Sequence, residues 1–153
     1  MQPLDETDLK ILRVLQLDGS LSVSEVADRV GLSQSPCSRR INRMQEDGVI
    51  TGRSVLLDRR KLGFDATILV RIKLSGHGRQ SISVFQEAAM RIPEVQVVQL
   101  MLGEFDFNLR VVVRDMDHFQ TLLRDKLVML PGLHEIQSTV ILEEMKYTAH
   151  LPI

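Results

Sequence analysis

The chain of 153 residues has one cysteine, no tryptophan and only 4% aromatic residues. The single Cys37 cannot form a disulfide within the chain, and without a second thiol it argues against a cysteine-based metal site. No stretch approaches the roughly 18 consecutive apolar residues of a membrane span, and the start, MQPLDETDLK, lacks the basic flank and apolar run of a signal peptide. These absences predict a soluble protein of the reducing cytoplasm that has no membrane partner.

Motifs of common enzyme classes are also missing. The sequence contains no Gly-x-Ser-x-Gly elbow, P-loop or dinucleotide fingerprint. Its histidines are scattered, and none has the spacing of a metal-binding pair. They are His77, His118, His134 and His150. We therefore predict that the protein is not an enzyme and that it holds no metal or resident cofactor.

The net charge of −1 conceals an uneven distribution of charge along the chain. Residues 29–61 carry eight basic and three acidic side chains, a net charge of +5, whereas residues 62–153 carry nine basic and eleven acidic side chains. A basic segment followed by a mildly acidic remainder suggests that the two parts have different functions, and that the basic part binds a negatively charged partner. Charge alone leaves open a chance fluctuation on a solvated surface.

Capping signals and apolar spacing predict two short helices in the first thirty residues. Asp5 is a suitable N-cap for the first helix, which an apolar stripe continues until Asp18 and Gly19 stop it. A capping-box pattern that starts at Ser22 begins the second helix, and Gly31 ends it.

A third predicted helix carries three of the eight basic residues of the segment 29–61. It begins at Ser33 or Ser35, because Pro36 is tolerated only in a first turn, and Gly48 supplies its stop. At roughly 100° per residue, one face of this helix is apolar and packs on the first two helices. The apolar face consists of Cys37, Ile41 and Met44, and the opposite face of Ser35, Ser38, Arg39, Asn42 and Arg43.

A short helix, a turn containing Gly31 and a second helix of this kind form a helix-turn-helix, whose second helix lies in the DNA major groove. Arginine pairs with guanine, asparagine with adenine, and serine or glutamine with bases or phosphates, while a helix N-terminus attracts phosphate. The predicted DNA-binding residues are Gln34, Ser35, Ser38, Arg39, Arg40, Asn42, Arg43 and, in a following strand or wing, Arg53. Three-helix domains also mediate protein contacts, and physical chemistry alone leaves that alternative open.

Periodicity in the second half predicts the order strand, helix, strand, strand, helix, strand. The predicted strands are residues 68–74, 95–102, 105–113 and 136–145, with Gly103 and Glu104 as a tight hairpin turn. The first helix ends at Pro93 and the second at Pro131–Gly132. This order is the split βαβ, or ferredoxin-like, arrangement, in which two helices pack on one face of a four-stranded antiparallel sheet.

Two helices can cover only one face of such a sheet. Val95 and Val97 are expected to point opposite to Val98 and Leu100, so both faces of the second strand carry apolar side chains. An uncovered apolar face predicts a symmetric dimer, which would present two recognition helices to successive half-sites on one duplex.

The segments LDETDLKIL, GLSQSPCSRRINRMQEDGVI and LLDRRKLGF, with their spacing, resemble the Lrp/AsnC family of leucine-responsive, or feast/famine, transcription regulators. The similarity extends through the second half and covers essentially the whole chain. It implies a sequence-specific, dimeric DNA-binding regulator whose dimers often assemble into tetramers or octamers. It also implies a small molecule, usually an amino acid, that binds between dimers.

The family's Gly-x-aromatic-Asp pattern appears here as Gly103-Glu104-Phe105-Asp106. Backbone N–H groups around Gly103 are suited to a carboxylate, and Asp106 is suited to an α-ammonium group. The residues expected to bind the effector are Leu100, Met101, Gly103, Glu104, Asp106, Gln137, Ser138 and Thr139. A structural alternative stays open, in which Gly103 and Glu104 are simply a turn that Asp106 caps.

The sequence thus predicts an α+β protein in two parts. Residues 1–51 form a winged-helix-like helix-turn-helix domain, 52–65 a linker strand, and 66–153 a ferredoxin-like βαββαβ domain for effector binding and oligomerisation. The expected partners are double-stranded DNA, an amino acid and further copies of the chain, in the cytoplasm of a bacterium or archaeon and associated with the nucleoid. The rival hypothesis is an architectural DNA-binding protein that has no effector. Separately, the apolar end of the C-terminal tail predicts that the tail docks on the protein, at a place that the sequence does not identify.

Overall fold

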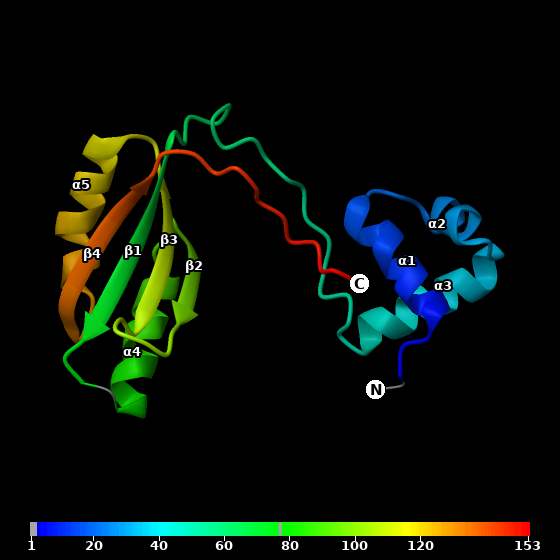
Figure 1. Ribbon diagram of the computed structural model, residues 1–153, viewed down its shortest axis with the longest axis horizontal. Helices are drawn as coiled ribbons and strands as arrows, with labels where there is room; N and C mark the ends of the chain where they lie inside the picture. Colours follow the sequence, from blue (N-terminus) through cyan, green and yellow to red (C-terminus); the bar gives the residue numbers. More distant parts are fainter. Residues whose placement is uncertain (1–2, 77) are drawn as a thin grey trace. The chain divides into compact units, whose positions relative to one another are not determined.

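The computed structural model describes residues 3–76 and 78–153, which divide into two compact units (Figure 1). One unit contains the residues up to Leu56 together with Lys146–Ile153, and the other is Leu57–Met145. The second domain predicted from the sequence extended to residue 153, whereas the last eight residues group with the first unit. His77, one of the scattered histidines, lies outside the described residues.

Three helices form the first unit: α1 (Glu6–Leu17), α2 (Val23–Val30) and α3 (Gln34–Glu46). The predicted N-cap Asp5 and the predicted capping box at Ser22 are confirmed, and Asp5 also forms a capping box with Asp8. Gly31 ends α2 with a φ of 71°, a left-handed conformation that glycine adopts at little cost. Ser33 is the N-cap of α3, so Pro36 falls in the first turn, where its missing N–H does no harm.

The predicted core face of α3 is confirmed. Cys37, Ile41 and Met44 are buried against apolar side chains of the other two helices, chiefly Ile11 of α1 and Val26 of α2. Burial raises the pKa of the Cys37 thiol, which keeps it protonated and unreactive at neutral pH. The cysteine is therefore part of the packing that fixes which side of α3 faces solvent.

The linker strand predicted for residues 52–65 does not form in this chain. Residues 51–58 have no regular secondary structure, and a turn follows them. Val55, Leu56 and Leu57 are 82%, 85% and 71% exposed. A strand requires a neighbouring strand to pair its backbone N–H and C=O groups, and no described segment of the same chain supplies one here.

The C-terminal tail docks on α1. Gln16 exchanges two hydrogen bonds with Leu151, its side-chain Nε2 donating to the Leu151 carbonyl and its Oε1 accepting from the Leu151 N–H, both at 3.0 Å. The Nε of Arg13 donates to the carbonyl of Ile153 at 2.9 Å. These contacts supply the docking site that the sequence predicted without locating it.

The second unit contains one antiparallel sheet and two helices, as predicted. Its strands are β1 (Ala66–Leu74), β2 (Val95–Leu100), β3 (Phe107–Val113) and β4 (Leu133–Ile141), in the order β2-β3-β1-β4. Helices α4 (Arg79–Met90) and α5 (Met116–Asp125) pack on one face of the sheet (Figure 1). The core between these layers includes Ile68, Val70, Ile72, Phe85, Phe107, Leu109, Phe119 and Leu122. The rings of Phe85 and Phe107 lie 4.6 Å apart at its centre.

Three local predictions in this unit are wrong. The helix expected to continue to Pro131 ends at Asp125, and a 3₁₀ turn, η1 (Leu127–Met129), follows it. The tight turn expected at Gly103 and Glu104 is a longer loop, residues 101–106. Val95 does not point away from Val98: a bulge between Val95 and Val97 interrupts the alternation, and both Val95 and Val98 pack on the core.

The sheet face away from the helices therefore lacks Val95, whereas Val97 lies on it as predicted. The strand registers place both polar and apolar side chains on it. These are Thr67, Leu69, Arg71, Lys73, Val97, Gln99, Asn108, Arg110, Val112, Glu135, Gln137, Thr139 and Ile141. No helix in the described part of the chain is long and apolar enough to cross a membrane.

Candidate DNA-binding surface and effector site

The exposed start of α3 forms an open depression lined by Gln34, Ser35, Ser38 and Arg39. No acidic residue lies in the first turn of α3, and the Ser33 side chain makes no capping hydrogen bond. The first backbone N–H groups of the helix are therefore not used by a side-chain cap, and the helix dipole adds partial positive charge there. This depression combines hydrogen-bonding side chains, a cation and a positive helix end, which together suit a phosphate backbone and base edges.

Arg39 is exposed and forms no salt bridge with the residues that the structure describes. Asn42, one turn further along α3, is also exposed. Arg53 is exposed on the irregular linker, and it does not line the depression that the four α3 residues share. Four of the eight predicted contacts thus form one compact group on α3, with Arg53 apart from it.

Arg40 and Arg43 lie in a different environment from Arg39. The NH1 of Arg40 donates to Asp5 Oδ2 at 2.7 Å and to Asp8 Oδ1 at 2.8 Å, and the NH2 of Arg43 donates to Asp8 Oδ2. Asp8 is completely buried, whereas the two arginine side chains are 30% and 28% exposed. Sequence reasoning assigned all three arginines to DNA, recognised Asp5 only as a helix cap and did not consider Asp8.

The ionisation of this cluster follows from its geometry. Burial by itself would raise the pKa of Asp8, but hydrogen bonds from Arg40, the Asp5 backbone and Arg43 outweigh it and leave that pKa lowered. The pKa of Asp5 is also lowered, chiefly by the Asp8 N–H and then by Arg40. Both carboxylates are charged at neutral pH, so they balance the two arginine charges.

In the second unit, Asp106 ties the loop 101–106 to the end of β1. Its Oδ2 accepts from the Leu74 N–H at 2.7 Å, its N–H donates to the Ile72 carbonyl at 2.9 Å, and its carbonyl accepts from the Met101 N–H at 2.8 Å. One side-chain oxygen of Asp106 therefore has a structural partner, which lies at the end of β1 and not in the Gly103–Glu104 turn. Leu100, Met101, Gly103 and Glu104 are exposed around this anchor.

Phe105 is a second anchor of the same loop, and sequence reasoning did not assign it a role. Its side chain is only 7% exposed, and the guanidinium carbon of Arg71 lies 5.1 Å from the centre of its ring. A cation over an aromatic face at this distance is favourable. The aromatic position of the Gly-x-aromatic-Asp pattern was the signal that could have identified it.

The predicted β4 residues do not all share one face. Gln137 lies opposite Arg71 and Thr139 opposite Leu69, on the face away from the helices, whereas Ser138 belongs to the other face. Strand pairing also aligns Gln137 with three side chains that sequence reasoning missed, in the polar row Gln99, Asn108, Arg71 and Gln137.

This polar row is incompletely hydrogen-bonded. The Nδ2 of Asn108 donates to Gln99 Oε1 at 2.9 Å, but Asn108 Oδ1 and Arg71 Nε are buried and find no hydrogen-bond partner within residues 3–76 and 78–153. A buried polar group without a partner costs on the order of 1–3 kcal/mol. The row therefore has capacity for polar groups from outside the single chain.

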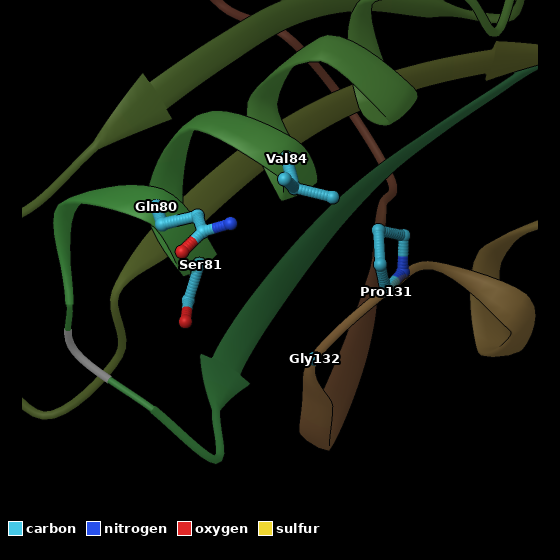
Figure 2. A pocket seen from close by; sticks show the side chains of 5 residues that line it. All are labelled: Gln80, Ser81, Val84, Pro131 and Gly132. Carbon is cyan, nitrogen blue, oxygen red and sulfur yellow. The ribbon is translucent and has the colours of Figure 1, made fainter.

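A second hollow lies between the start of α4 and the segment after η1 (Figure 2). It is lined by Gln80, Ser81, Val84, Pro131 and Gly132, none of which the sequence analysis selected. Figure 2 shows the polar tips of Gln80 and Ser81 on one side and the Pro131 ring across from them. None of these side chains is charged, so the hollow offers no salt bridge to the ammonium or carboxylate of an amino acid.

Comparison with known proteins agrees with both parts of the fold. Residues 4–51 match the family model of a winged helix-turn-helix DNA-binding domain, and residues 67–151 match that of the Lrp/AsnC ligand binding domain. The transcriptional activator DecR of Escherichia coli K12 is 36% identical over 150 residues, which cover 98% of this chain and 99% of DecR. The leucine-responsive regulatory protein of the same strain is 35% identical over 150 residues, covering 98% of this chain and 92% of that protein.

Solved structures give the same result. An AsnC family transcriptional regulator from Agrobacterium tumefaciens superposes with a TM-score of 0.92 at 38% identity, covering 97% of each chain. A transcriptional regulator from Neisseria meningitidis in complex with L-Met also has a TM-score of 0.92, at 32% identity, covering 98% of this chain and 97% of that one. The predicted fold class and the family resemblance are confirmed.

Proposed function

Because this chain belongs to the Lrp/AsnC family of DNA-binding transcriptional regulators, which are not enzymes, we propose that it is a sequence-specific regulator whose operator binding responds to an amino acid. DNA is bound by α3, and the amino acid is bound by the C-terminal domain where dimers meet. The observation that carries this proposal is the grouping of Gln34, Ser35, Ser38 and Arg39 on one exposed, acid-free helix start.

The proposed reading surface follows the chemistry of the major groove. Arg39 is placed to pair with guanine, and Asn42 to pair with adenine. The serines and Gln34 supply hydrogen bonds to bases or phosphates, and the start of α3 receives a phosphate. Arg53 on the linker contacts the DNA backbone outside the groove. This division separates base contacts, which specify sequence, from phosphate contacts, which position the helix.

The proposed effector site is centred on the loop 101–106. Asp106 and Phe105 hold this loop against β1, which leaves the Gly103 and Glu104 backbone exposed for a ligand carboxylate. Gln137 and Thr139 supply polar contacts from β4. A similar regulator was solved with L-Met, which supports an amino acid as the class of effector.

Assembly beyond a single chain is part of the proposal. Buried, unpaired polar atoms of Arg71 and Asn108 on the open sheet face suit a second copy that brings partners for them. The exposed Leu100 at the end of β2 and Leu102 of the loop suit contacts between dimers, which further assemble into tetramers or octamers. An effector bound at such a contact changes the spacing of the DNA-reading heads and hence operator affinity.

A thermal-shift screen of the purified protein against the twenty amino acids and their common breakdown products tests the effector. A ligand that binds only the folded protein raises its melting temperature. At a free ligand concentration of 100 times Kd, it adds about 2.7 kcal/mol to the free energy of unfolding. We expect a selective shift for one chemical class, together with altered DNA binding in the presence of that compound. If no compound shifts the melting temperature while the protein still binds DNA, the architectural hypothesis replaces the effector-responsive one.

A further inference from the structure

The three arginines of α3 have different environments, although helical geometry places two of them together. Arg39 and Arg43 are four residues apart and so about 40° apart around the helix axis. Arg39 nevertheless lines the exposed depression, whereas Arg43 reaches back to Asp8 at the start of α1. Helix periodicity alone therefore does not explain which arginine charge is available to DNA; the contacts of each arginine with other helices must also matter.

The aspartate cluster on α1 provides that selection. Asp5 and Asp8 already satisfy each other's backbone through the capping box, with the Asp8 N–H donating to Asp5 Oδ1 at 2.8 Å and the Asp5 N–H donating to Asp8 Oδ2 at 3.1 Å. A capping acid has no need to be buried, because capping works equally well at an exposed helix end. Asp8 is nevertheless completely buried, and its oxygens also accept from Arg40 and Arg43.

We propose that Asp8, supported by Asp5, is a positioning residue for DNA recognition. It holds the guanidinium groups of Arg40 and Arg43 against α1, so that Arg39 is the arginine of α3 whose charge remains available to DNA. The inference rests on the proposed DNA surface of α3, and it reassigns Arg40 and Arg43 from DNA contacts to a clamp between α1 and α3.

Charge balance gives this clamp a measurable consequence. Among the described residues, the carboxylates of Asp5 and Asp8 face the guanidinium groups of Arg40 and Arg43, so these four charges balance. An arginine whose charge is already balanced displaces no counterion from DNA, whereas each free cation that contacts phosphate steepens the fall of log K with log salt by about 0.9. The salt dependence of binding therefore counts the arginines that DNA meets, which a purely structural ion pair would not change.

The experiment measures binding of the full chain to a random-sequence DNA duplex by fluorescence anisotropy between 50 and 200 mM NaCl. Random-sequence DNA places no fixed guanine opposite Arg39, so its charge meets phosphate there, and we expect Arg39→Gln to reduce the slope by about one per DNA-binding head. Arg40→Gln and Arg43→Gln are expected to leave it unchanged. Asp8→Asn, which frees one positive charge, is expected to raise the slope by about one, so affinity falls about fourfold more across this salt range.

Two further variants control for net charge and for folding. Glu6→Gln changes the protein charge by the same amount as Asp8→Asn, but Glu6 pairs with Arg13 of its own helix, so the slope is expected to stay near that of the wild type. The double variant Asp8→Asn/Arg43→Gln restores the charge balance and is expected to return the slope to its wild-type value, even where a single variant folds poorly. Circular dichroism establishes that each variant is folded at the assay temperature.

Specific outcomes overturn the inference. A slope reduced by Arg40→Gln or Arg43→Gln as much as by Arg39→Gln means that these arginines contact phosphate. If Glu6→Gln raises the slope as much as Asp8→Asn does, the net charge of the protein alone explains the effect. If Asp8→Asn leaves the slope unchanged, loss of the Asp8 carboxylate does not make an arginine of the cluster available to DNA. A slope that Arg39→Gln does not change points instead to failure of the proposed α3 surface, which separates the two hypotheses.

Discussion

The DNA-binding unit and the ligand-binding unit hold their candidate functional side chains in different ways. In the first, Gln34, Ser35, Ser38 and Arg39 come from six consecutive positions of one helix, and the other two helices only set its orientation. In the second, the loop 101–106 and the polar row come from the strands of a whole sheet. The first surface is complete within one chain, whereas the second leaves buried polar atoms of Arg71 and Asn108 without partners among the described residues.

Because of this difference, DNA binding and effector binding are expected to be sensitive to different kinds of substitution. A surface carried by one helix depends on a few side chains and on the packing that fixes the rotation of that helix. A site assembled from several strands depends on strand register and on a neighbouring molecule. Changes in the first unit should therefore alter DNA binding directly, while changes in the second should alter the response to the effector and leave the intrinsic DNA affinity intact.

The largest effect is expected from Phe85→Ala, which tests whether the two units are energetically separate. Phe85 is fully buried against Phe107, so its loss should cost the ligand-binding unit about 3–5 kcal/mol of unfolding free energy. Differential scanning calorimetry with each unit's transition followed should assign the loss to the second unit. Val84→Ala, at a neighbouring exposed position, is the matched control and should cost far less. An equal loss in both units would contradict their separation.

Arg39→Ala should have the next largest effect, on operator affinity. Loss of a paired contact to guanine costs about 1–3 kcal/mol per head, and the melting temperature should not change because Arg39 faces away from the core. Gel-shift or anisotropy titration against a selected operator measures this loss. Arg91→Ala removes an exposed arginine in the other unit and should leave affinity within about twofold, so equal affinities of the two variants would refute the assignment.

The Asp8 cluster should make the stability of the first unit depend on acid pH. The folded-state pKa of Asp8 is lowered, so its ion pairs stabilise the fold above about pH 4, where the unfolded aspartate is ionised, and this contribution is lost as pH falls through the folded pKa. Because Arg40 and Arg43 are partly exposed, we expect a loss of about 1–2 kcal/mol.

Urea unfolding of the wild type and of Asp8→Asn between pH 6 and pH 3 measures this loss. The two proteins should differ most at neutral pH and converge in acid, since Asp5, Arg40 and Arg43 remain in both. Asp125→Asn, which removes an exposed carboxylate paired with Arg124, should change the curve much less. Parallel curves for the wild type and Asp8→Asn would mean that Asp8 contributes nothing through its charge.

A small loss of stability is expected from Asp106→Ala, which separates structural support from ligand binding. It removes the acceptor of the Leu74 N–H and should cost about 1 kcal/mol. Asp115→Ala is a matched control, because Asp115 caps α5 of the same unit through the His118 N–H and its loss should cost a similar amount. Only Asp106→Ala should abolish the thermal shift caused by the effector; a normal shift would make Asp106 structural alone.

Local signals in the sequence predicted the helical unit well. Helix caps, a left-handed glycine and apolar spacing each involve residues only a few positions apart, so the local sequence is enough to predict them. The examples are the caps Asp5 and Ser22, Gly31 and the apolar face of α3. The same logic predicted the order of strands and helices in the second unit. It failed where a single residue changes the register: the bulge at Val95 moved a side chain to the opposite face, and no sequence signal marked it.

By itself, the sequence determined the helix-turn-helix, the ferredoxin-like order of elements and the candidate DNA surface on α3, because helix periodicity and capping depend on short-range geometry. Only the tertiary structure decided how Arg39 differs from Arg40 and Arg43, because Asp8 meets them from more than thirty positions away. It also decided that Asp106 is bonded to β1 and that Arg71 faces Phe105. Such pairings depend on how segments distant in the sequence pack together. The free energy of burying a charged side chain depends on which polar and charged groups that packing places next to it.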